Sequence, residues 1–189
     1  MDSTEVKEFF EQVSGQWDQM HQDFYSTDVI DALAAHSALG PDAHVVDVGT
    51  GTGFIAGGLA ARAGRVTGTD SSPAMLARAR VNLEGLGIEN VDLLEAGVDR
   101  LPLPDDAADA AVANMVLHHA PVPAVMIAEM ARVVRPGGTV AVTDCVEHGH
   151  EWMRSEQADL WLGFSPETMA ELFAVSGLVD YGYTYLGTA

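Results

Sequence analysis

Along the middle of this chain, short runs of apolar residues alternate with stretches in which apolar residues stand three or four positions apart. The short runs are typical of buried strands, and the spaced stretches are typical of amphipathic helices. The expected strands are 45–48, 65–69, 91–95, 109–114 and 139–143, and the expected helices between them are 54–61, 73–83 and 122–134. Strands and helices that alternate in this way build a parallel sheet with helices on both faces. The sequence therefore predicts an α/β protein with a doubly wound, mostly parallel sheet.

Further helices are expected on both sides of this core. Residues 3–14 and Asp28–Leu39 predict two leading helices, and Ser165–Gly177 predicts a last one. Leu178–Leu186 then predicts one strand, which gives a sheet that is shortened at its C-terminal edge. Because an unpaired edge strand invites pairing with another chain, we expect a homodimer.

The stretch 45–56 combines a buried strand, a glycine loop and the start of a helix. Gly49, Gly51 and Gly53 can take positive φ angles and let a ligand touch the backbone. A strand that leads into such a loop aims free N–H groups at one spot, so we expect a ligand there. From Gly51 onwards the loop matches the G-x-G-x-x-A pattern of dinucleotide sites. The carboxylate of Asp47, which precedes the first glycine, instead suits a ligand with positive charge.

Three further polar residues stand where expected strands end: Asp70, Asn114 and Asp144. Ligands of open α/β sheets bind outside the carboxyl ends of the strands, so we expect these residues to converge with Asp47. An acid at the position of Asp70 accepts hydrogen bonds from both ribose hydroxyls of a nucleoside. It does so in dinucleotide sites and in adenosylmethionine sites alike.

Composition and charge narrow the classes of ligand and partner. The 189 residues suit a single domain, and no apolar run approaches the ~20 residues that span a bilayer. The chain has 28 Asp and Glu against nine Lys and Arg, which gives a net charge of −19. Such a surface repels nucleic-acid phosphates and anionic membranes, so we expect neither as a partner. The single cysteine and the acidic N-terminus without a signal-peptide pattern favour the cytoplasm.

From about Val45 to Asp144 the chain resembles the class I S-adenosylmethionine-dependent methyltransferases, in particular the small-molecule, type 11-like kind. The resemblance is carried by the loop Asp-Val-Gly-Thr-Gly-Thr-Gly, the block Met-Val-Leu-His-His at 115–119 and the turn Val-Arg-Pro-Gly-Gly at 134–138. It implies a Rossmann-like fold, S-adenosylmethionine as methyl donor and S-adenosylhomocysteine as product. The implied partner is a small-molecule acceptor, methylated on oxygen, carbon, sulfur or a metalloid centre.

The resemblance also implies how one methyltransferase domain is laid out over residues 1–189. Residues 1–40 would form N-terminal lid helices, 41–144 the cofactor-binding core, and 145–189 an acceptor-side segment with the last helix and strand. Similar leading helices lie over the cofactor in related enzymes, and packing on the sheet edge is the alternative. Trp17 and Tyr25 are the candidate lid residues.

For the cofactor, the resemblance implies contacts from the glycine loop and from the ends of the neighbouring strands. These residues are Asp47, Gly49, Thr50, Gly51, Thr52, Gly53, Asp70, Ser71, Met75, Gly97, Val98, Asn114 and Met115. One of them departs from the family pattern, because Gly97 stands where the family usually has an aspartate. Adenine would then be recognised by the backbone of Val98, by Asp99 or by Glu95.

For the acceptor, we expect contributions from His118, His148 and Glu147. An imidazole titrates near neutral pH, so His118 and His119 could deprotonate an acceptor. The alternative is that one of the two packs against the cofactor and the other caps the next helix. Residues 145–151 include two histidines, two glutamates and Cys145, but no pair has an established metal-ligand spacing, so no metal is predicted.

The aromatic residues of the same region leave two further alternatives. Trp152, Trp161 and Phe164 could line an apolar acceptor pocket or complete the core.

Arsenite methyltransferases of this fold use several cysteines, and the single cysteine of this chain argues against arsenite as the acceptor.

Two other functions compete with the methyltransferase prediction. The dinucleotide-like loop favours an NAD-dependent oxidoreductase. In the methyltransferases that the chain resembles, the sheet normally closes with two strands after the last helix, whereas one is expected here. This difference and Gly97 favour a non-catalytic module that binds S-adenosylmethionine.

Overall fold

The computed structural model describes residues 3–17, 27–37 and 39–187. Its centre is a five-stranded sheet in which every pairing is parallel. The strands are β1 (His44–Val48), β2 (Arg65–Asp70), β3 (Val91–Glu95), β4 (Ala108–Asn114) and β5 (Val134–Thr143). Their order is β3-β2-β1-β4-β5, so the chain begins in the middle of the sheet and winds outward in both directions. The predicted doubly wound parallel sheet is confirmed.

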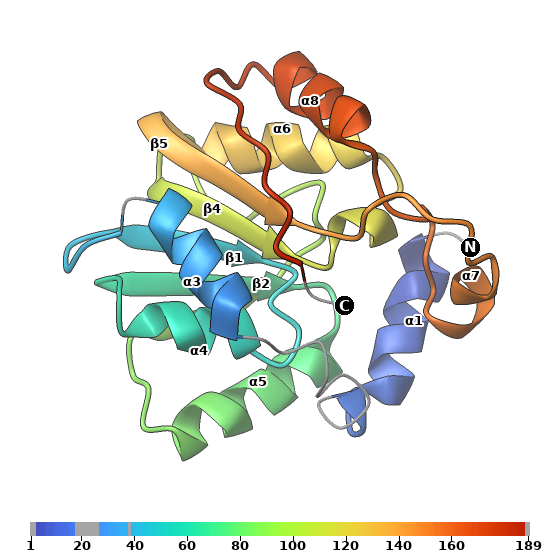
Figure 1. The fold of residues 1–189 in the computed structure, drawn as a ribbon. Coiled ribbons are helices and arrows are strands. Elements are labelled where there is room, and N and C mark those ends of the chain that lie inside the picture. Colours follow the sequence, from blue (N-terminus) through green and yellow to red (C-terminus); the bar gives the residue numbers. More distant parts are fainter. Residues whose placement is uncertain (1–2, 18–26, 38, 188–189) are drawn as a thin grey trace.

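Helices cover both faces of this sheet (Figure 1). One face carries α3 (Thr27–His36), α4 (Phe54–Ala60) and α5 (Pro73–Gly85), and the other carries α6 (Pro123–Val133) and α8 (Pro166–Val175). Two of these helices begin at a serine whose side chain accepts a backbone N–H and at a proline in the first turn. These capping residues are Ser72 for α5 and Ser165 for α8.

Alternate residues of the central strands point to opposite faces and build two separate cores. The first core lies beneath α3 and α4, and its members include Val45, Leu33 and Leu59. The second lies beneath α6 and α8, and its members include Val46, Met126 and Met130. Full burial of an aliphatic side chain of this size contributes about 1.5–3 kcal/mol, so packing on both faces fixes the strand ends that carry the site.

The fifth strand starts earlier than the sequence predicts. Residues 135–138, expected as a turn before the strand, belong to β5. Val134 pairs with Ala108 and Thr139 pairs with Ala110, so the four residues between them form an irregularity in the ladder. Gly137 takes a φ of +83° there, a conformation that glycine allows without strain.

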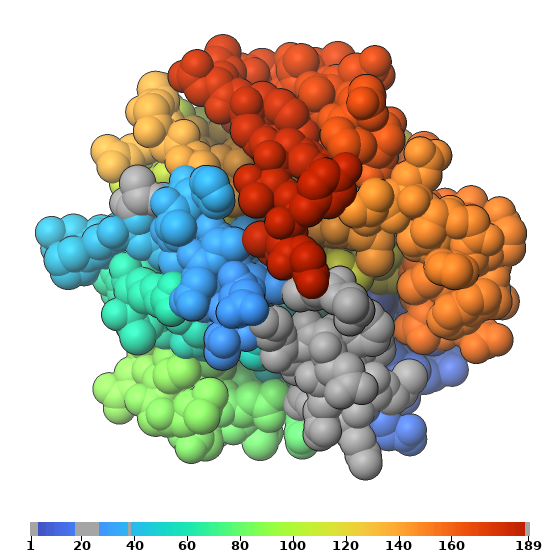
Figure 2. Space-filling view, viewed as in Figure 1, coloured from blue at the N-terminus to red at the C-terminus, as the bar shows by residue number. Residues whose placement is uncertain are grey.

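The predicted strand Leu178–Leu186 is wrong, because residues 178–187 form no strand and β5 remains an edge of the sheet. The large side chains that suggested the strand are exposed, among them Val179, Tyr181, Tyr183 and Tyr185. A strand is stabilised by packing and by a partner, and this segment has too little buried surface to supply the first. In Figure 2 the segment, coloured red, lies on the surface of the molecule.

Two helices stand outside the two layers, beyond the carboxyl ends of the strands (Figure 1). They are α1 (Ser3–Val13) and the short α7 (Trp152–Glu156). By contrast, α3 buries Val29, Ile30 and Leu33 in the first core, so it packs on the sheet instead of acting as a lid. Tyr25 lies outside the described residues. Within the described ranges, no helix combines the length and hydropathy that a membrane crossing requires.

Candidate functional site

A cavity of about 790 Å³ lies at the carboxyl ends of the strands. The glycine loop and the ends of β2 and β4 form its floor, and α1 and α7 contribute to its walls. Apolar side chains contribute most of the lining surface, and polar and charged side chains line the rest. This combination is typical of a site for a small organic ligand.

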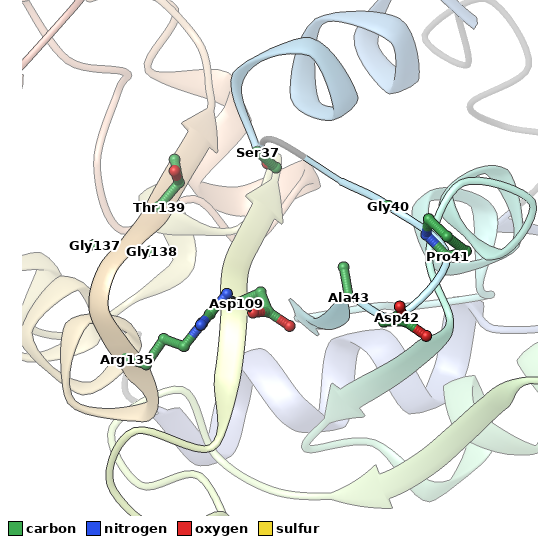
Figure 3. A pocket seen from close by; sticks show the side chains of 10 residues that line it. All are labelled: Ser37, Gly40, Pro41, Asp42, Ala43, Asp109, Arg135, Gly137, Gly138 and Thr139. Carbon is green, nitrogen blue, oxygen red and sulfur yellow. Dashed lines mark ion pairs between the residues drawn. The ribbon is translucent and has the colours of Figure 1, made fainter.

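A second pocket, of about 460 Å³, lies near the amino ends of β1, β4 and β5 (Figure 3). Its charged residues include Asp109 and Arg135, which form an ion pair with each other. The backbone N–H of His44 also donates to the Asp109 carboxylate, over 2.7 Å. These contacts join the amino ends of neighbouring strands. None of the residues predicted to bind a ligand lines this pocket.

The glycine loop has the backbone conformation that the sequence predicts. Gly49, Gly51 and Gly53 have φ angles of +70°, +54° and +87°. A Cβ at Gly49 would lie 2.5 Å from a methyl group of Val116. A Cβ at Gly51 would meet nothing within 4 Å, because this residue faces the open cavity. The loop therefore needs glycine for backbone conformation at each position and for space at the first.

Asp47 lies behind this loop and is absent from the cavity wall. Its side chain is 1% exposed and accepts a hydrogen bond of 2.6 Å from the Thr50 hydroxyl. Burial raises the pKa of Asp47 to about 7, although hydrogen bonds from Thr50 and from the backbone of Ala56 act in the opposite direction. The carboxyl group thus ties the loop to the start of α4.

Asp70, at the end of β2, lies on the cavity wall. Its two oxygens accept the backbone N–H groups of Gly51 and Ser72, each over 2.9 Å. Burial raises the pKa of Asp70, and these hydrogen bonds and the charge of Lys7 offset part of that rise. Each carboxylate oxygen has a second lone pair, so both can also accept a ligand hydroxyl.

The loop after β3 contributes Gly97, Val98 and Asp99 to the wall. A Cβ built at Gly97 would lie 2.7 Å from Oδ1 of Asp99, so the Asp99 carboxylate occupies the space of the side chain that Gly97 lacks. Glu95 forms an ion pair with Lys7 over 3.2 Å and does not line the cavity. Of the two acids suggested by the sequence for adenine, only Asp99 is placed on the wall.

The end of β4 is held by β5. Thr143 donates its hydroxyl to Oδ1 of Asn114 over 2.7 Å, and its carbonyl accepts the N–H of Met115 over 2.9 Å. Met115 has a φ of +55°, which is unusual for a residue other than glycine. Such conformations persist where the surroundings impose them and cluster at ligand sites. Asn114 and Met115 both line the cavity.

His118 faces the cavity from the short 3₁₀ helix η2 (Leu117–His119). Its side chain is buried, and its Nδ1 lies 2.7 Å from Oδ1 of Asp144. An ionised carboxylate only accepts, so Nδ1 carries the proton and Nε2 is the remaining ring atom. Burial lowers the pKa of His118, but the charge and hydrogen bond of Asp144 and the charge of Asp159 raise it, and the net shift is upward.

Asp159 is a wall residue that sequence reasoning missed. It lies in the loop between α7 and α8, and its Oδ1 is 3.7 Å from Nε2 of His118. The backbone N–H groups of Leu160 and Trp161 both donate to the carbonyl of His118 over 3.0 Å, which docks this loop onto η2. No motif or periodicity marks Asp159, because only the docking of a distant loop brings it to the site.

The Methyltransferase domain family matches residues 46–142, which is half of the chain and includes the loop, Asp70 and His118. The chain belongs to this methyltransferase family. The predicted class I methyltransferase fold is thereby confirmed, with S-adenosylmethionine as the cofactor of the family, and the prediction of an NAD-dependent oxidoreductase is set aside.

Three proteins illustrate how this chain compares with known ones. It is 34% identical to an arsenite methyltransferase of Halobacterium salinarum over 60% of the chain and 30% of that protein. It is 33% identical to 2-methyl-6-phytyl-1,4-hydroquinone methyltransferase 2, chloroplastic, of Oryza sativa over 83% of the chain and 45% of that protein. A SAM dependent methyltransferase from Aquifex aeolicus has the same fold, with a TM-score of 0.70, 21% identity and coverage of 94% and 88%. The chain thus spans 30% and 45% of the length of these two curated relatives.

The cavity at the carboxyl ends of the strands collects most of the residues that the sequence assigns to the cofactor. The wall includes Gly49, Thr50, Gly51, Thr52, Asp70, Ser71, Met75, Gly97, Val98, Asn114 and Met115. Asp47 and Gly53 lie behind the wall, Asp47 beneath the loop and Gly53 against Ala79 of α5.

Of the residues predicted to contact the acceptor, one lines the cavity and two do not. His118 lines the cavity, whereas Glu147 and His148 do not. The backbone of His148 donates to the carbonyl of Leu162 over 2.9 Å, and its ring lies 5.0 Å from that of His150, centre to centre. His119 does not cap α6, whose N-cap residue is Val122. Its ring instead packs edge-on against Phe10 of α1.

Of the aromatic residues predicted to line a pocket, some lie on the cavity wall and others do not. Trp152 and Trp17 line the cavity, the second beside Phe10 of α1. Phe164 is buried in the second core, and Trp161, which is absent from the wall, donates its indole N–H to the carbonyl of Ala120. Only Trp152 of the three acceptor-side aromatics therefore meets the cavity.

Proposed function

We propose that this chain is an S-adenosylmethionine-dependent methyltransferase that acts on a small-molecule acceptor. The observation that carries the proposal is a single cavity lined by two chemically different sets of residues. The glycine loop, Asp70 and Asp99 form the set that we call the cofactor half, and His118 and Asp159 belong to the set that we call the acceptor half. The first set suits a nucleoside cofactor, and the second suits an acceptor.

In the cofactor half, each residue has a task that its position supports. Asp70 accepts the ribose hydroxyls, and the bare backbone of Gly51 lets the cofactor approach the loop closely. Asp99 takes over recognition of the adenine amino group, because its carboxylate stands beside Gly97. Asp47 contributes indirectly, by holding the loop through Thr50. The cofactor supplies a methyl group on a sulfonium, whose positive charge makes the sulfur a good leaving group.

In the acceptor half, the chain positions the acceptor and excludes water. The acceptor's lone pair forms a bond to the methyl carbon while the carbon–sulfur bond breaks, and the electron pair of that bond stays on sulfur. Any proton on the attacking atom is released to solvent. His118 engages the acceptor through Nε2, because Asp144 holds its Nδ1. Alignment of this kind supplies much of the rate enhancement in transfers that need little other chemistry.

The division of the chain follows from these tasks. We propose that residues 41–144 bind the cofactor and that 145–189 serve the acceptor. Within residues 1–40, α1 acts as the lid, since its residues Val6, Lys7 and Phe10 line the cavity. Glu147 and His148 lie off the wall, so a direct catalytic role is assigned to neither.

The experiment is to measure S-adenosylhomocysteine formation from S-adenosylmethionine with a panel of acceptors. The panel includes arsenite and alkylated hydroquinones, the acceptor types in the names of two relatives, together with phenols, thiols and amines. Turnover with at least one acceptor, and its loss in Asp70→Ala, is the expected result. Tight cofactor binding without product from any acceptor would support the non-catalytic alternative, and no cofactor binding would overturn both.

We also propose a homodimer in the cytoplasm. The edge strand β5 supports the first proposal, since the expected C-terminal strand does not cover it. The single cysteine supports the second. Sedimentation equilibrium at micromolar concentration should give twice the chain mass of 20.0 kDa, and a mass of one chain would contradict the dimer.

A further inference from the structure

Asp159 carries a polar atom that the described part of the protein does not satisfy. Its side chain is buried, with 4% of the residue exposed, and Oδ1 has no hydrogen-bond partner among the described residues. A buried carboxylate oxygen without a partner is costly, and native structures rarely keep one without a ligand or an ion. The Asp159 side chain lies on the cavity wall.

Two imidazoles face this carboxylate. Nε2 of His118 lies 3.7 Å from Oδ1 of Asp159, and Nδ1 of His119 lies 4.0 Å from the same atom. Since Nδ1 of His118 donates to Asp144, the neutral ring presents a lone pair at Nε2. A lone pair and a carboxylate oxygen that face each other at 3.7 Å repel unless Nε2 takes up a proton or a metal cation stands between them.

We propose that His118, His119 and Asp159 bind a divalent cation of the zinc class on the acceptor side of the cavity. One ligand atom from each residue lies within 4.8 Å of the other two. Bonds of ~2.1 Å at tetrahedral angles would place the ligand atoms about 3.4 Å apart. The His118–Asp159 pair is already close to this spacing. Nδ1 of His119 lies 3.1 Å from the carbonyl of Ala158, so His119 must exchange this hydrogen bond for the bond to the cation.

The surroundings hold these ligands in place. Asp144 fixes the ring of His118 from behind, as carboxylates commonly do for metal-bound histidines. The loop with Asp159 is docked through Leu160 and Trp161, whose N–H groups donate to the carbonyl of His118. The site is therefore organised by the fold before a cation binds.

Among the described residues, this is the one group of three His, Cys, Asp or Glu side chains close enough to share an ion. The 145–151 segment, whose composition suggested metal ligands, does not form such a group. The ring centres of His148 and His150 lie 5.0 Å apart with the rings tilted, and neither residue lines the cavity. These two histidines serve as a control for metal bound to histidines outside the cavity.

Two histidines and one carboxylate leave a coordination position open, as in catalytic zinc sites. That position faces the cavity, where an acceptor oxygen or sulfur could bind to the cation. Binding would release the O–H or S–H proton to solvent and keep the attacking lone pair available for the methyl carbon. The acceptor class is then a molecule with an ionisable hydroxyl or thiol. With the cation bound, Nε2 of His118 contacts the acceptor through the cation and not directly. This last step rests on the proposed function, whereas the cation site itself does not.

The test is calorimetric titration of Zn²⁺ into chelator-stripped protein, with Co²⁺ absorption as a second readout. We expect one ion per chain and visible Co²⁺ bands typical of four or five nitrogen and oxygen ligands. Asp159→Asn should weaken Zn²⁺ binding by at least tenfold, and Asp144→Asn by about 10–100-fold. The control His148→Ala/His150→Ala should bind as the unaltered chain does.

Two results would overturn the inference. One is the absence of stoichiometric Zn²⁺ and Co²⁺ binding by the unaltered chain, which requires no variant to fold. The other is binding that survives Asp159→Asn but is lost in His148→Ala/His150→Ala. S-adenosylhomocysteine titration without metal separates the two proposals. Retained nucleoside binding with no metal binding refutes only the cation site, whereas lost nucleoside binding with retained metal binding refutes only the methyltransferase.

Discussion

Replacement of Asp70 by alanine should weaken nucleoside binding strongly while the fold persists. The Asp70 carboxylate already accepts the N–H groups of Gly51 and Ser72, and it is proposed to accept both ribose hydroxyls. Asp70→Ala removes all four acceptor functions. The start of α5 keeps its own cap, because the Ser72 hydroxyl accepts the N–H of Met75 over 3.3 Å. The loss should therefore fall on the site and not on the helix.

The magnitude follows from the number of hydrogen bonds to the charged group. A hydrogen bond to an ionised side chain contributes about 1.5–3 kcal/mol net. The loss of one ribose contact at the lower limit of that range already weakens binding by more than about tenfold. The loss of both, about 3 kcal/mol, corresponds to more than about a hundredfold. Release of the Gly51 N–H would loosen the loop and add to the loss.

Calorimetric titration with S-adenosylhomocysteine at fixed salt measures this effect. The matched control is Glu95→Ala, which removes the same charge from the residue paired with Asp70 across the β2–β3 ladder. Among the described residues, the side chain of Glu95 makes an exposed ion pair with Lys7, so its loss should cost less than about 1 kcal/mol. Unchanged affinity in Asp70→Ala, or an equal loss in Glu95→Ala, would refute the assignment of the ribose to Asp70.

Three further predictions concern other parts of the site. Asp99→Ala should weaken S-adenosylhomocysteine by about tenfold and leave a ribose-only fragment unaffected, as calorimetry can test. Gly49→Ala should destabilise the fold more than Gly51→Ala, because both strain a positive φ but only the Cβ at position 49 would lie 2.5 Å from a methyl group of Val116. Gly51→Ala should nevertheless lose nucleoside binding. Urea unfolding and titration separate these two effects. Because the pKa of Asp47 is raised to about 7, the free energy of unfolding should fall by up to ~4 kcal/mol as pH rises from 4 to 7. Asp47→Asn should make this fall smaller, which midpoints of urea unfolding at several pH values can measure.

Each of these predictions has an outcome that contradicts it. Equal losses for the fragment and the full nucleoside in Asp99→Ala would place its effect outside adenine recognition. A Gly51→Ala variant that binds normally would show that the ligand does not approach that backbone. The sign for Asp47 holds because the folded state keeps the proton more tightly than the unfolded state, whose pKa stays near 3.8. A pH profile that is the same with and without Asp47 would contradict it.

The fold and most residues of the cofactor half could be predicted from the sequence alone, because both depend on local sequence patterns. Alternating strands and helices dictate the doubly wound sheet, and that topology brings the carboxyl ends of its strands to one edge. Positive φ angles at Gly49, Gly51 and Gly53 follow from residue type and spacing. The residues that end β2 and β4 therefore reach the cavity wall without further information.

Only the tertiary structure decided the direction of individual side chains and the meeting of distant loops. Asp47 precedes the loop in sequence, yet the pleat of β1 turns it behind the loop and away from the ligand. The segment 178–186 has a strand-like pattern, but it finds no partner in the described structure.

The role of Asp159 could not be predicted, because the docking of its loop on η2 brings it to His118. No local spacing in the sequence marks this contact. Hydrophobic periodicity fixes which elements form and which face they bury. The position of a polar side chain in a loop depends on long-range hydrogen bonds, which periodicity does not encode.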